Sequence, residues 1–153
     1  ILLDIVSNGR NRIAIAAFEA KMREDIMSSL VAVSALFLAG GLGTLLRFAL
    51  SSAVQRQVGL SFPWGTMAVN LLGCFLFGLL WSLLENRVEV TRELRAVVLV
   101  GFLGGFTTFS SFAFEAAGLL RDGAWLAAAA HMLGQNALGV ALVFLGLAAG
   151  RHG

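Results

Sequence analysis

GFLGGFTTFSSFAFE, residues Gly101–Glu115, combines enough apolar sequence to enter a bilayer with features that an ordinary membrane helix avoids. Its three glycines weaken helical order. Its hydroxyl groups need hydrogen-bond partners that lipid does not offer, so they face inward or toward a neighbouring helix. These hydroxyls belong to Thr107, Thr108, Ser110 and Ser111. We therefore predict a helix that is broken here and whose polar groups line a path through the membrane.

The composition of the whole chain indicates an integral membrane protein. Hydrophobic residues make up 58% and charged residues 13%, and the mean hydropathy is +0.85. Soluble domains carry roughly 25% charged residues, and a helix needs about 20 apolar residues to span the hydrocarbon core. We predict an all-α protein with four transmembrane helices: Leu30–Ser52, Phe62–Leu84, Leu94–Leu120 and Ala124–Ala149.

The sequence lacks the features of several other protein classes. Cys74 is the single cysteine, which excludes a disulfide framework and a cysteine metal site. Basic residues are scattered and the formal charge is only +2, so we expect no nucleic acid partner. The sequence has neither a Walker lysine motif nor a recognisable pair of nucleophile and base, so we expect no enzyme activity.

Residues 1–28 differ from the rest of the chain because charged residues concentrate there. We assign residues 1–28 to a charged N-terminal extension and residues 29–153 to a four-helix transmembrane domain. Asn11–Met27 is predicted to form an amphipathic helix, since apolar residues recur at helical spacing. The extension is either a solvated or interfacial segment without chemistry or a non-native piece upstream of a start at Met22 or Met27.

The distribution of arginines gives the chain almost no preferred orientation in a membrane. Short connections make neighbouring helices antiparallel. Without the extension, one side carries Arg87, Arg92, Arg95 and Arg151, and the other carries Arg47, Arg56 and Arg121. Because the positive-inside bias is then nearly absent, an antiparallel, dual-topology homodimer is the simplest arrangement. A single, weakly biased topology stays open, and native Lys21 and Arg23 would favour it.

The first two spans each contain a polar residue beside glycines. GGLGTLLRF carries Arg47, which must reach the interface or meet a carbonyl or carboxylate partner. GTMAVNLLG carries Asn70, whose amide costs free energy in lipid unless it is hydrogen-bonded. Asn70 either bonds to another helix or offers its two N–H groups to an anion. The glycines by themselves indicate close helix packing.

The third span carries an aromatic stripe and a glycine pair. Phe109 and Phe112 are three residues apart, so both rings lie on one helical face. Such a stripe is either packing or, because a ring has a positive edge, a lining for a small anion. At a break after Gly104 and Gly105, freed backbone carbonyls would suit a small hard cation.

With these three motifs in this order, the chain resembles the Fluc (CrcB-type) fluoride channel family from about Val33 to Gly150. The resemblance implies a passive channel that exports cytoplasmic fluoride and confers fluoride resistance. It further implies multi-pass subunits in the cell inner membrane, paired as antiparallel homodimers in the lipid bilayer. Each dimer would have two fluoride pores and a structural sodium ion on its axis.

The resemblance also implies roles for individual residues. Phe109 and Phe112 match the pore-lining phenylalanines, and Asn70 matches the fluoride-coordinating asparagine. Gly104 and Thr107 match the positions whose backbone carbonyls hold sodium. The pore hydroxyls are to be sought among Thr108, Ser110 and Ser111, and supporting roles fall to Arg47 and Glu115.

The fourth span departs from the family pattern. Relatives commonly carry an aromatic residue and then small hydroxyl residues there, whereas this chain has His131, Gln135 and Asn136. Gln135 either replaces a serine donor or only packs. His131 could make conduction sensitive to pH.

The main alternative is a proton-coupled small multidrug transporter, which is also a short four-helix, dual-topology protein. That chemistry needs a membrane-embedded carboxylate. The first span has no acidic residue, and we expect Glu115 near a helix end. A non-transporting assembly subunit would explain the glycines but not the interleaved rings and hydroxyls.

Overall fold

The structure, a computed structural model, describes residues 9–59, 61–85 and 90–151. All of its regular elements over these ranges are helical. By length and composition, four helical stretches can cross a membrane: Ile15–Val58, Trp64–Glu85, Arg92–Arg121 and Trp125–Gly150. The predicted all-α, four-span membrane class is confirmed.

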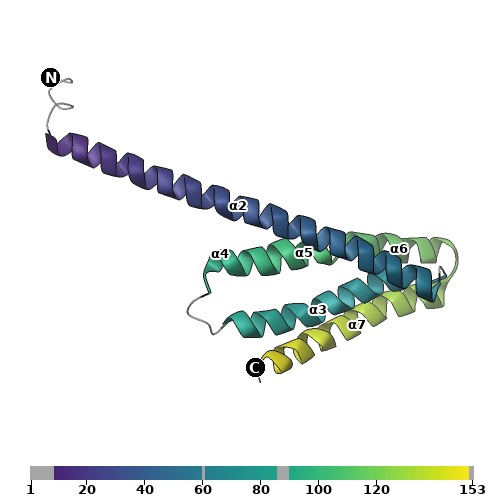
Figure 1. The fold of residues 1–153 in the computed structure, drawn as a ribbon. Helices are drawn as coiled ribbons and strands as arrows, with labels where there is room; N and C mark the ends of the chain where they lie inside the picture. Colours follow the sequence, from purple (N-terminus) through teal and green to yellow (C-terminus); the bar gives the residue numbers. More distant parts are fainter. Residues whose placement is uncertain (1–8, 60, 86–89, 152–153) are drawn as a thin grey trace. The chain divides into compact units, whose positions relative to one another are not determined.

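Helix α2, Gly9–Val58, is longer than the sequence predicted (Figure 1). Asn11–Met27 is helical as expected, but the helix continues without interruption through the first span. Among the described residues, those up to Ser34 belong to one compact unit and those from Ala35 onward belong to a second. In the first unit, the side chains from Ile15 to Leu30 are all exposed.

Helices α3, Trp64–Glu85, and α7, Trp125–Gly150, lie side by side through glycines (Figure 1). Gly78 and Gly146 are both buried. A Cβ added at Gly146 would lie 2.7 Å from the Leu79 nitrogen, and one added at Gly150 would lie 2.7 Å from the Ser82 Cβ. Small residues allow this close approach, which is how helices associate where no hydrophobic effect drives them together.

The third span consists of four helical pieces. They are α4 Arg92–Arg95, the π-helical segment η1 Ala96–Phe102, α5 Leu103–Phe106 and α6 Phe109–Arg121. Thr107 and Thr108 between α5 and α6 have extended backbone, with ψ of 162° and 112°. After α6, Gly123 adopts a φ of +73° and closes the turn into α7, a conformation that favours glycine.

Gln55 near the end of α2 organises the connection to α3. Its Nε2 donates to the carbonyls of Gly59 and Phe62, and its Oε1 accepts from the Gly65 N–H at 2.9 Å. Helix α3 begins at Trp64, directly after Pro63 and two residues after the start of the predicted span.

The α3–α7 contact predicts the effect of a methyl group at Gly146. We expect Gly146→Ala to destabilise the protein by about 1–3 kcal/mol because the methyl overlaps the α3 backbone. Thermal unfolding in detergent measures this, with Gly118→Ala as the control, since nothing lies within 4 Å of a Cβ added there. Equal unfolding midpoints for the two variants would contradict the close packing.

Candidate functional site

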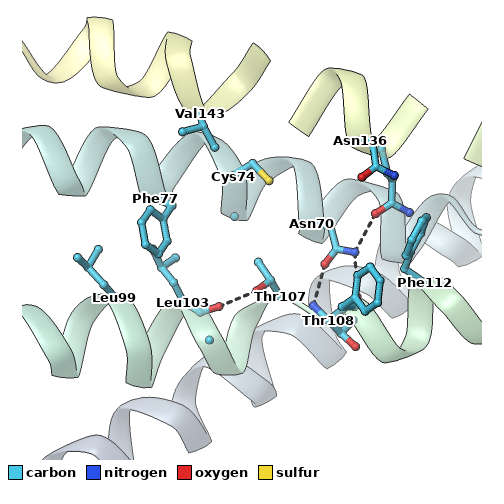
Figure 2. Close-up of a pocket in the computed structure, with 14 residues that line it drawn as sticks. Asn70, Cys74, Phe77, Leu99, Leu103, Thr107, Thr108, Phe112, Asn136 and Val143 are labelled. Atoms are coloured by element: carbon cyan, nitrogen blue, oxygen red, sulfur yellow. Dashed lines mark hydrogen bonds between the residues drawn. The ribbon is translucent and has the colours of Figure 1, made fainter. Parts of the chain in front are cut away.

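Asn70 on α3 bridges the interruption between α5 and α6 (Figure 2). Its Oδ1 accepts from the Thr108 N–H at 2.8 Å, and its Nδ2 donates to the Thr108 carbonyl at 3.0 Å. One side-chain amide thus satisfies both backbone groups of a residue that has left the helix. Backbone polar groups within a membrane need such a partner, because lipid offers none.

At the interruption, two backbone N–H groups bond to side-chain oxygens instead of the carbonyls that they would reach in an unbroken helix. The Thr108 N–H, which would otherwise bond the Gly104 carbonyl, goes to Asn70. The Ser111 N–H, which would otherwise bond the Thr107 carbonyl, goes to Thr108 Oγ1 at 3.2 Å. The backbone oxygens of Gly104 and Thr107 are thereby left to accept from, or coordinate, something else.

Arg47 on α2 holds the turn just before the interruption. Its Nε donates to the Gly105 carbonyl at 3.0 Å, and Thr44 Oγ1 lies 3.4 Å from the same oxygen. Of the partners that the sequence left open for Arg47, the structure therefore has a carbonyl. Gly105 has room for no side chain, because a Cβ there would overlap the backbone carbonyl oxygen of Gly40.

Phe109 and Phe112 are neighbours at the start of α6. Their ring centroids are 5.5 Å apart, with an angle of 48° between the planes. Phe112 is 8% exposed, whereas Phe109 is 77% exposed. Both rings line a cavity of about 430 Å³ next to the interruption.

This central cavity has uncharged walls. It is lined by Asn70, Gly73, Cys74, Phe77, Leu99, Leu103, Gly104, Thr107, Thr108, Phe109, Phe112, Gln135, Asn136 and Val143 (Figure 2). Among the three candidate hydroxyls, Thr108 belongs to this lining. Its Oγ1 lies 3.0 Å from Ser111 Oγ and 3.4 Å from Ser110 Oγ. Such a cavity offers neutral donors and aromatic rings to a small ion.

A second polar cluster surrounds Glu115. Glu115 lies on α6, six residues before the third span ends at Arg121. Its Oε1 accepts from Thr66 Oγ1 at 2.6 Å. Its Oε2 is buried without a hydrogen bond and lies 3.5 Å from His131 Nε2. Glu115 and Thr66 line a separate cavity of about 360 Å³ beneath the α2–α3 connection.

His131 and Gln135 on α7 connect the two cavities. His131 is fully buried, and both of its ring nitrogens lie 3.3 Å from Gln135 Nε2. Gln135 Oε1 accepts from Asn70 Nδ2 at 2.8 Å. A continuous series of polar contacts therefore runs from Thr66 and Glu115 to the central cavity. Asn136 takes no part in this series, since it is exposed and donates to the Met132 carbonyl of its own helix.

Sequence reasoning did not single out Thr66 as part of the site. The available signal was its position four residues before Asn70, which puts both polar side chains on one face of an apolar helix. The same spacing relates His131 to Gln135 on α7. Asn70 and Gln135 meet directly across the α3–α7 packing, whereas Thr66 and His131 are linked through Glu115 of α6.

Comparison with known proteins places most of the chain in one group. The profile of the family described as "CrcB-like protein, Camphor Resistance (CrcB)" matches residues 34–147. A protein of Nitrosococcus oceani named "Fluoride-specific ion channel FluC" is 62% identical over 109 residues, or 71% of this chain and 87% of that protein. Proteins of the same name from Nitratidesulfovibrio vulgaris and Solidesulfovibrio magneticus are 53% and 54% identical, each over 74% of this chain and 92% and 91% of their own lengths.

Proposed function

The chain belongs to the CrcB (Fluc) family of fluoride channels, and we propose that it is a passive, fluoride-selective channel of the cell inner membrane. Relatives that are 62%, 53% and 54% identical to it over the aligned residues are named fluoride-specific ion channels. Four helices long and apolar enough to span a membrane are consistent with that function. The observation that carries the proposal is the series of neutral polar groups and rings at the interrupted third span.

A channel can export fluoride without an energy source of its own, because the membrane potential drives the ion. Fluoride that enters as neutral HF dissociates at cytoplasmic pH and is then trapped as an anion. A negative-inside membrane potential drives the anion outward with about 2.3 kcal/mol per charge per 100 mV. Passive conduction therefore suffices for fluoride resistance.

The ion is proposed to pass beside Asn70, Phe109, Phe112 and Thr108. Asn70 supplies amide N–H groups, Thr108 a hydroxyl, and the phenylalanines their positive ring edges. Ser110 and Ser111 stay predictions as pore hydroxyls, and in this conformation they adjoin Thr108 Oγ1. Neutral donors can replace part of the hydration of fluoride without holding it as tightly as a cation would.

The polar series from Asn70 to Glu115 supports a path that continues along α7. Gln135 and His131 connect the central cavity to the cavity at Thr66. A narrow path with few polar partners requires the ion to be nearly dehydrated. Chloride is larger and would fit the same donors poorly, which is the proposed basis of selectivity.

A structural sodium ion is proposed at the carbonyls of Gly104 and Thr107. The diversion of their usual donors to Asn70 and Thr108 supports this, because carbonyl oxygens released from a helix bind small hard cations. Two carbonyls are too few to enclose such an ion. A second copy of the chain would supply the same two and complete the site.

An antiparallel homodimer with two pores is proposed for the same reason. The outer surface of the central cavity includes Phe109, which is largely exposed in a single copy. A second copy would cover this ring and close the wall of the pore. The nearly equal numbers of arginines on the two sides of the membrane favour opposite orientations for the two copies.

A small multidrug transporter is not favoured. Glu115 is a carboxylate within a membrane-spanning stretch, as that chemistry needs, but it is engaged by Thr66 and faces His131. The relatives named above are fluoride channels, and the match to the CrcB profile covers all four spans at least in part.

The function predicts ion selectivity in liposomes. We expect purified protein to release fluoride when a potential is applied and to release chloride at least a hundredfold more slowly. Phe112→Ile should reduce fluoride efflux at least tenfold, because the ring beside Asn70 is lost. An ion-selective electrode measures both anions.

The matched control for the ring is Phe114→Ile, since Phe114 is 78% exposed and lies on the same helix outside the cavity lining. It should conduct like the parent protein. Equal release of fluoride and chloride by the parent would contradict the function. Normal conduction by a correctly dimerised Phe112→Ile would contradict only the role of the ring.

Dual topology predicts labelling from both sides of the membrane. In a Cys74→Ser background, we expect Arg56→Cys at the end of α2 to react with an impermeant maleimide from both faces of sealed vesicles, about half from each. A permeabilised sample gives the total. Reaction from a single face would refute the antiparallel dimer.

The sodium site predicts stabilisation by sodium alone among common monovalent cations. We expect the thermal midpoint of the purified dimer to rise with sodium and to stay constant with N-methylglucamine. At 100 times its dissociation constant, sodium would contribute about 2.7 kcal/mol. Identical midpoints in both salts would rule out the proposed site.

A further inference from the structure

The amide of Asn70 has no free N–H in this conformation. Its two donors go to the Thr108 carbonyl at 3.0 Å and to Gln135 Oε1 at 2.8 Å. An anion beside Asn70 needs a donor, and Gln135 presents an oxygen to that donor instead. The oxygen of Gln135 therefore occupies the hydrogen-bonding position that an anion would take.

The other end of the same amide faces His131. Gln135 Nε2 lies 3.3 Å from each of the two ring nitrogens. Gln135 is 9% exposed and His131 is fully buried, so the protein supplies hydrogen-bond partners to both ends of the Gln135 amide, which also borders the central cavity. Each end of the Gln135 amide thus depends on one protein group, Asn70 on one side and His131 on the other.

A neutral imidazole can serve either end of an amide. One of its nitrogens carries a hydrogen and the other carries a lone pair, and both are equally close to Gln135. With Nε2 toward the ring, the lone pair accepts from the amide. With Oε1 toward the ring, the N–H donates to the amide.

The ring of His131 is held in place by two aromatic neighbours. Its ring meets Phe62 edge-on, at a centroid distance of 5.5 Å, and packs on Phe112 at 5.1 Å. A ring fixed by two aromatic neighbours keeps its nitrogens facing Gln135 whichever way the amide is turned. Turning the terminal amide about its last torsion exchanges oxygen and nitrogen with almost no change in volume.

We propose that Gln135 is a two-position amide switch of the ion path, with His131 as its positioning residue. Without an ion, Oε1 accepts from Asn70 and Nε2 donates to His131. When fluoride arrives at Asn70, the amide turns, Nε2 donates to the ion beside Asn70 Nδ2, and Oε1 accepts from His131. In both states the oxygen and the nitrogen of the Gln135 amide each have a hydrogen-bond partner. Arrival of the ion therefore replaces one hydrogen bond with another and leaves neither group unpaired. The inference rests on the proposed channel function.

Ion flux tests the switch with a near-isosteric substitution. Gln135→Met keeps the length of the side chain but has no amide, so we expect fluoride efflux to fall at least tenfold relative to the parent. Leu133→Met is the control, because Leu133 lies on the same helix, is 71% exposed and does not line the cavity, and it should conduct within twofold of the parent. Parent-like flux through Gln135→Met would overturn the proposal and leave the channel function intact, whereas absence of fluoride flux in the parent would refute the channel function itself.

A spectroscopic measurement on the intact parent keeps the test independent of variant folding. The chain contains three glutamines, Gln55, Gln57 and Gln135. Glutamine-selective ¹⁵N labelling therefore gives three side-chain amide signals, assigned by Gln55→Asn and Gln57→Asn. Fluoride should shift the Gln135 signal and not the Gln55 signal, and chloride should shift neither.

His131→Phe tests the positioning role, since it keeps a buried ring without nitrogens. In this variant the Gln135 signal should no longer respond to fluoride, even if the dimer is intact. A Gln135 signal that ignores fluoride in a conducting parent, or that still responds in His131→Phe, would overturn the switch.

Discussion

The paired hydrogen bonds between the Asn70 amide and the backbone of Thr108 are the interaction on which the site depends. Two extended residues inside a membrane-spanning stretch cost several kcal/mol for each backbone group that stays unpaired. A side-chain amide carries an N–H donor and an oxygen acceptor side by side, so it can satisfy an N–H and a carbonyl of the same residue. Asn70 thus permits the chain to leave the helix at a depth where lipid could not replace the lost hydrogen bonds.

Several properties of the fold serve to bring α3 close enough for that contact. Gly73 lies against the Thr107 side chain, and Gly105 lies against Gly40, so both sides of the interruption approach another backbone. Arg47 holds the Gly105 carbonyl, which fixes the last turn of α5. The small residues that the sequence offered as packing positions are therefore part of the site, because they set the distance across which Asn70 acts.

Much of this arrangement follows from the sequence, and the remainder depends on how helices rotate about their axes. Hydropathy predicted the four spans, and the glycines and hydroxyls of residues 101–115 pointed to the segment where Thr107 and Thr108 are extended. Helical spacing predicted that Phe109 and Phe112 are neighbours. Spacing does not identify a partner on another helix, so the contacts of Glu115 with Thr66 and of Gln135 with Asn70 required the structure. Composition also did not predict that α2 continues unbroken from the charged segment into the first span. A change in charge content does not mark a helix end, because charged residues can lie within a helix.

The placement of charge supports the proposal that a single polar series serves a passive ion path. Arg47 is committed to a backbone carbonyl, and the carboxylate of Glu115 lies in a separate cavity, beyond His131. The central cavity is left with amides, two threonine hydroxyls and rings, each of which contributes a partial charge. A full positive charge there would bind an anion too tightly for rapid release, and a full negative charge would exclude it. Neutral groups avoid both outcomes, provided that each has a partner when no ion is present, and the contact between Gln135 and Asn70 meets that condition.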